Sequence, residues 1–158
     1  MRDILVLSIV LLGGITALKK PWIGIMLWTW LSIMNPHRYT WGIAFDAPVA
    51  AFAAITTLIG FLTTRERVWP LREAASILLV LLMGWMTLSW LTGLDPAHDY
   101  SEWKKVMKID GMIILSLALL HTKQHILALV WVSAGSLAIL GAKGGLFTFV
   151  TGGDHRVW

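Results

Sequence analysis

Two histidines, His121 and His125, are four residues apart, a spacing that would place both imidazoles on one face of a helix as metal ligands. No carboxylate and no third histidine lies near them in the sequence, and Lys123 stands between them. We therefore interpret the pair as interfacial and partly solvated. We predict no metal site and no cofactor, and we find no Ser/His/Asp set and no close pair of carboxylates.

The absence of cysteine excludes a cysteine nucleophile, thiolate metal sites and disulfides. The glycine-rich segment 141–145, GAKGG, has the composition of a phosphate-binding loop. It lacks, however, the glycine–lysine–hydroxyl order of a nucleotide-binding P-loop. Helix termination and tight packing explain this segment better than nucleotide binding does.

The segment Asn35-Pro36-His37-Arg38 joins a helix-stopping Asn-Pro to an imidazole and a fixed cation. A guanidinium offers a planar fork that matches phosphate oxygens, which suits a lipid-linked phosphate at a membrane surface. The alternative is an ordinary loop with one arginine whose side chain reaches the interface. Asp154-His155-Arg156 leaves the same two interpretations open.

Three lysines, Lys104, Lys105 and Lys108, lie on a predicted amphipathic helix whose opposite face is apolar and includes Trp103. Such a helix is typical of segments that lie in the membrane interface. We therefore expect the lysines and Trp103 to contact anionic lipid headgroups rather than one particular substrate.

The composition places these residues in a membrane protein. Of 158 residues, 57% are hydrophobic and 14% are charged, whereas soluble domains average about 45–50% and about 25%. Ten tryptophans support this reading, because the indole ring favours the headgroup region. The net charge of +4 is carried by loops and reflects membrane topology and anionic lipid, not nucleic acid.

The predicted fold is an all-α, polytopic transmembrane helical bundle that forms a single domain over residues 1–158. An interfacial helix is predicted at 95–108, and the first two spans are short enough to be tilted crossings or a hairpin that does not fully cross. The first run is a retained helix and not a signal peptide, because it lacks a small-residue cleavage site. About six spans are expected, near 4–18, 21–34, 48–64, 74–94, 109–120 and 126–142.

The orientation follows from the lysines and arginines between the spans. One group lies in short, mostly basic loops, and we place it in the cytoplasm. The other group lies among acidic residues, and we place it in the periplasm of a bacterium, with the chain in the inner membrane. The cytoplasmic group is Lys19, Lys20, Arg65, Arg67, Arg72 and Lys123.

Several segments resemble one family: RDILVL (2–7), PWIG (21–24), WTWLSIMNPHR (28–38), WKKVMKI (103–109) and KGGLFT (143–148). Gly152-Gly153 and Arg156-Val157-Trp158 follow them. Together they resemble the N-terminal region of the O-glycosylation ligases associated with exosortase A, which belong to the O-antigen ligase and polymerase superfamily. The resemblance covers essentially the whole chain, and the Asn-Pro-His-Arg and Lys-Gly-Gly segments are its most specific parts.

The resemblance implies an enzyme that transfers a glycan from an undecaprenyl-pyrophosphate carrier to an acceptor at the periplasmic face, without a metal. Basic residues would hold the pyrophosphate leaving group, and a general base would lie in a long periplasmic loop. Relatives in this family continue beyond the position of Arg156. Arg156 is the one residue for which the resemblance implies a contact with the pyrophosphate. The chain is therefore expected to be an N-terminal part that needs its C-terminal region and is inactive alone.

A rival interpretation is a non-enzymatic membrane scaffold or interaction module of a polysaccharide export or exosortase system. A transporter is disfavoured, because strongly polar residues are scarce within the spans and transport pathways usually need them.

Overall fold

The computed structural model describes residues 2–39, 45, 47–65 and 68–152. Within them the chain is all-α, which confirms that part of the predicted fold. Two short 3-10 turns, η1 (Pro36–Tyr39) and η2 (Pro70–Arg72), accompany six helices. The helices are α1 (Arg2–Lys19), α2 (Pro21–Met34), α3 (Val49–Thr63), α4 (Ala74–Leu91), α5 (Pro96–Leu119) and α6 (Lys123–Thr151).

Local sequence signals set several of the helix ends. Pro21 occupies the first turn of α2, where a missing N–H costs no hydrogen bond. The same helix ends at Asn35, whose φ of 45° is left-handed and whose N–H donates to the Leu31 carbonyl. The Asp95 side chain caps α5 by accepting from the His98 N–H at 3.1 Å. These ends fall where the sequence predicts them.

Helix α5 differs from the prediction. The expected division into an interfacial helix at 95–108 and a span at 109–120 is absent, because one uninterrupted helix runs from Pro96 to Leu119. Trp103 and Met107 face Thr87 of α4. The Trp103 indole N–H donates a hydrogen bond to the Thr87 hydroxyl, and the Met107 sulfur accepts one from the same hydroxyl. The apolar face therefore packs against a neighbouring helix, a use that sequence amphipathicity does not distinguish from contact with lipid headgroups.

Helix α6 also exceeds its prediction of 126–142, because it begins at Lys123 and continues through the glycine-rich segment to Thr151. The interpretation of that segment as a helix terminus is therefore wrong. Glycine costs about 1 kcal/mol in a helix interior but does not forbid it. The helix continues through the apolar residues that follow, and within it the Thr148 hydroxyl donates a hydrogen bond to the Gly144 carbonyl at 3.0 Å. The helix ends at Gly152, whose φ is 65°.

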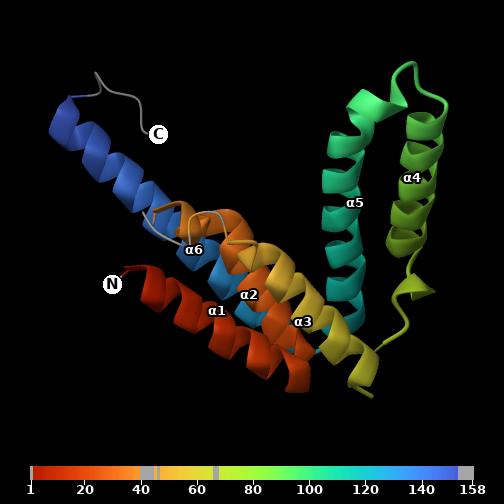
Figure 1. The fold of residues 1–158 in the computed structure, drawn as a ribbon. Coiled ribbons are helices and arrows are strands. Elements are labelled where there is room, and N and C mark those ends of the chain that lie inside the picture. Colours follow the sequence, from red (N-terminus) through yellow and green to blue (C-terminus); the bar gives the residue numbers. More distant parts are fainter. Residues whose placement is uncertain (1, 40–44, 46, 66–67, 153–158) are drawn as a thin grey trace.

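The helices alternate in direction and form two arms (Figure 1). The first arm holds α1, α2 and α3 packed together, with α6 against α2. The second arm is the antiparallel hairpin of α4 and α5. The arms join at the lower end of Figure 1, where the Val68 N–H donates to the Ala118 carbonyl at 3.1 Å, and they diverge toward the upper end.

Two apolar clusters hold the first arm and its junction with α5. Val10, Leu31 and Ala53 belong to the cluster formed by α1, α2 and α3. Ile25 and Leu119 belong to the cluster that joins α2 to α5. The first arm therefore has a packed interior of its own, whereas the second arm is attached to it mainly near the lower end.

Small residues bring α1, α2 and α3 into close contact. A Cβ added at Gly24 would overlap the fully buried Thr57 hydroxyl and lie 2.9 Å from the Ala17 Cβ. A Cβ added at Gly60 would overlap the Ala17 carbonyl oxygen. Such close approach at small residues is common between membrane helices, where dispersion contacts replace the hydrophobic effect as the packing force.

Two helices, α4 and α6, are long and apolar enough to cross a membrane, with mean hydropathies of 1.9 and 1.8. Helices α2 and α3 are apolar but shorter. Only 6% of each candidate span is buried, so neither resembles the core helix of a soluble protein. The structure thus contains two candidate membrane-spanning helices, and the six predicted crossings go beyond that finding.

Candidate functional site

The predicted phosphate-binding segment lies directly after α2. His37 and Arg38 are in the 3-10 turn η1, which packs against α1, and the His37 side chain is half-buried. Arg156 lies outside the described residues. The structure therefore gives η1 a defined backbone at the upper end of the first arm, and the pairing of Arg38 with Arg156 stays a prediction.

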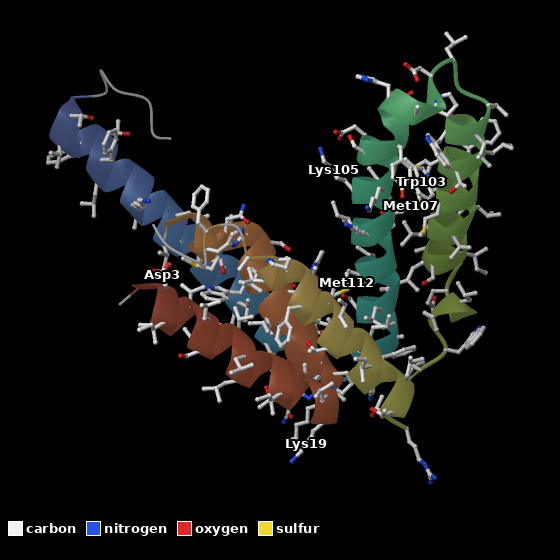
Figure 2. The ribbon with its side chains drawn as sticks, viewed as in Figure 1. Asp3, Lys19, Trp103, Lys105, Met107 and Met112 are labelled. Atoms are coloured by element: carbon white, nitrogen blue, oxygen red, sulfur yellow. The ribbon has the colours of Figure 1, made fainter. Side chains whose placement is uncertain are left out.

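The three predicted lysines lie on α5, and Lys105 lies on the side away from α4. Figure 2 shows Lys105 on this side and shows Trp103 and Met107 between α5 and α4. Lys104 and Lys108 are four residues apart and share a helix face. We refer to Lys104, Lys105 and Lys108 as the lysine row, and all three side chains are exposed.

The charges of the lysine row are not equivalent. The Lys105 Nζ lies 2.6 Å from the Glu102 carboxylate, and both side chains are exposed. The hydrogen bond from Lys105 and its positive charge lower the pKa of Glu102. The Lys104 Nζ lies 5.6 Å from the centre of the Tyr100 ring. Lys104 and Lys108 therefore carry the charge that is available to an anionic ligand.

Trp103 belongs to an aromatic cluster near the upper end of the second arm. Its ring stacks on Trp90 with centroids 4.5 Å apart, and Tyr100 lies 5.9 Å from it. The indole N–H of Trp103 donates to the Thr87 hydroxyl at 3.2 Å. The Trp90 N–H donates to the Pro96 carbonyl at 2.8 Å. This cluster fixes the lysine-bearing part of α5 against α4.

A groove of about 710 Å³ lies below the lysine row, between α3 and α5. Lys108 belongs to the wall that α5 contributes, and most of the other residues that line the groove are apolar. The lining includes Ala50, Ala54 and Leu58 from α3 and Gly111, Met112 and Leu115 from α5. Sequence reasoning missed this groove, because its walls are about 60 residues apart in the chain.

His121 lies in the connection between α5 and α6, and His125 lies in the first turn of α6. Their rings are perpendicular, with centroids 5.6 Å apart, and His125 stacks on Trp22 at 4.6 Å. Over residues 2–152, apart from the undescribed gaps, no group of three or more metal-ligating side chains occurs. The contact with Trp22 gives His125 a packing role between α2 and α6.

Asp110 was not singled out from the sequence. It lies within α5 one turn from Met107, with 9% of its surface exposed. Its Oδ2 is buried and has no hydrogen-bond partner. The signal available in the sequence was an isolated acid inside an otherwise apolar run, which marks a candidate functional residue when the run is in a membrane.

The fold and site define an all-α protein with two candidate membrane-spanning helices and a lysine-edged apolar groove. The chain belongs to a family of unknown function, DUF5935, whose model matches residues 1–157. No curated protein and no solved structure matches it.

Proposed function

We propose that the chain is the N-terminal membrane domain of a glycan transferase of the O-antigen ligase and polymerase type. Its donor would be a glycan linked to undecaprenyl pyrophosphate, and transfer would take place at the periplasmic face of the bacterial inner membrane. The whole chain would cross the membrane about six times, with the lower end of Figure 1 in the cytoplasm.

The observation that carries this proposal is the alternation of the helix directions. It brings η1, the start of α5 with the lysine row, and the end of α6 to the upper ends of the two arms (Figure 1). These are the segments in which the sequence concentrates candidate anion-binding residues. A lipid-linked pyrophosphate would meet positive charge from several elements at that membrane face.

These residues would contribute to the transfer by electrostatic stabilisation of the leaving group. Cleavage of the glycosyl–phosphate bond leaves negative charge on the pyrophosphate, which preplaced cations stabilise. Arg38 and Arg156 would contact its oxygens through two parallel hydrogen bonds each, and His37 would lie beside them. The general base would come from the C-terminal region of the same protein, so the chain alone would bind donor without transferring the glycan.

A second candidate, a non-enzymatic membrane scaffold, draws support from a different observation. The outward face of α4 and the last turns of α6 expose large apolar side chains, such as Trp85, Phe149 and Val150. Exposed apolar surface of this extent marks contact with lipid or with another protein. The scaffold would use that surface for partners and would have no need of Arg38 or Arg156.

The six crossings predict the location of each loop. A reporter that fluoresces only in the cytoplasm should be active when fused after Arg67. A reporter that is active only in the periplasm should function when fused after Arg38 or Asp95. Lys19, Arg65 and Lys123 lie at one end of the fold, as a shared cytoplasmic location of their loops requires. Activity in the reverse compartments would refute this orientation.

Replacing Arg156 by lysine in the native gene should impair glycan transfer markedly. The substitution keeps the charge but removes the planar fork that would hold two phosphate oxygens. Transfer would be measured in a deletion strain complemented with each variant, with membrane levels of the protein checked by immunoblot.

The matched comparison for Arg156→Lys is Arg38→Lys. A loss of transfer in both variants at normal abundance would support a shared pyrophosphate contact, and a loss in Arg156→Lys alone would leave Arg38 as a loop anchor. Full transfer by Arg156→Ala at normal abundance would refute the proposed role and favour the scaffold.

A further inference from the structure

We propose that the groove between α3 and α5 binds one acyl chain of an anionic glycerophospholipid, whose phosphate is held by Lys108 and Lys104. This inference is independent of the proposed glycan transfer, because it concerns a lipid of the surrounding bilayer and not the glycan carrier.

The walls of the groove favour a flexible hydrocarbon chain. On α3 they are formed by Ala50, Ala54 and Leu58, and on α5 by Met112 and Leu115. The small side chains on α3 leave the volume of about 710 Å³ open. A Cβ added at Gly111 would meet no atom within 4 Å, so the α5 wall is open there as well. Such a surface offers dispersion contacts but few hydrogen bonds, which suits an acyl chain.

The length of the groove agrees with one acyl chain. The α5 wall extends along the helix from Lys108 to Ala118, a distance of ten residues that corresponds to about 15 Å. The hydrocarbon core of a bilayer is about 30 Å thick, so the chains of one leaflet extend over about half of it. The α5 wall of the groove is therefore about as long as the acyl chains of one leaflet.

Charge complementarity selects the headgroup. Lys108 lies at the groove wall, and Lys104 follows one turn above it on the same face of α5. Lys105 is paired with Glu102, and the Asp110 carboxyl is buried and does not line the groove. The two remaining ammonium groups favour a headgroup with net negative charge, such as phosphatidylglycerol, over a zwitterionic one.

The test measures phosphatidylglycerol and phosphatidylcholine binding to the protein purified from its own membrane in detergent, by native mass spectrometry. Wild type should bind one phosphatidylglycerol in preference to phosphatidylcholine. Gly111→Leu, which fills open space in the groove, should weaken phosphatidylglycerol binding about tenfold or more. The matched control is Gly84→Leu on α4, where an added Cβ also meets nothing within 4 Å and no groove is lined.

The lysines are tested separately. Lys104→Gln and Lys108→Gln should each weaken phosphatidylglycerol binding about fivefold and leave phosphatidylcholine binding unchanged. Lys123→Gln, at the opposite end of the fold, should change neither. Equal binding of the two lipids by wild type, or unaltered binding by Gly111→Leu, would overturn the proposal. Recovery of a polyprenyl pyrophosphate from the purified protein, displaced by Gly111→Leu, would also overturn it and assign the groove to the glycan carrier.

Discussion

Gly60→Ala should lower the unfolding temperature of the purified protein. The new methyl group would overlap the Ala17 carbonyl oxygen, and a backbone atom inside a packed helix cannot move aside cheaply. Overpacking of this kind costs about 1–3 kcal/mol. In a chain of this size each kcal/mol corresponds to about 2–4 °C. The unfolding temperature would be measured in detergent from the fluorescence of the ten tryptophans.

Gly84→Ala is the control for this substitution. It makes the same chemical change within a helix, but its Cβ would meet no atom within 4 Å. Its unfolding temperature should equal or slightly exceed that of wild type, because alanine is the better helix former. An equal fall in both variants would mean that glycine flexibility, and not the contact of α1 with α3, determines the result.

Asp110→Leu should raise the unfolding temperature. The carboxyl is buried within α5, and its Oδ2 has no hydrogen-bond partner, an arrangement that costs about 1–3 kcal/mol. Asp110→Asn, which retains polarity and size, should raise the temperature less.

The same variants would show whether Asp110 is retained for function. A more stable Asp110→Leu protein that no longer supports glycan transfer would identify a residue kept at the expense of stability. A more stable variant with full transfer would identify a tolerated imperfection. A less stable Asp110→Leu protein would refute the prediction and indicate that the carboxyl has a partner in the membrane.

The fold was predictable from the sequence wherever the signal is local. Pro21, Asn35 and Asp95 act on their own backbone neighbours, and the corresponding helix ends lie where they were expected. The continuity of α5 was not predictable, because α4 covers its apolar face and the sequence of α5 alone does not show which neighbour will do so. The extent of α6 was missed for another reason, since glycine was given more weight than its modest cost in a helix.

The candidate site was predictable only in part. The lysine row could be identified because its members are close in sequence, and their common face follows from helical spacing. The groove below it depends on α3 and α5 meeting at one end and separating at the other, a long-range feature. Asp110 could have been identified as the one charged residue within the six predicted spans.

The unequal helix lengths have a consequence for the surrounding bilayer. Helix α2 has 14 residues and is about 21 Å long, whereas α6 has 29 and is about 43 Å long. Against a hydrocarbon core of about 30 Å, the first is too short and the second too long. In the proposed six-span topology, a membrane that accommodates both would thin beside α2 while α6 tilts, at a cost of fractions of a kcal/mol per ångström. The domain would therefore be surrounded by lipid of uneven thickness.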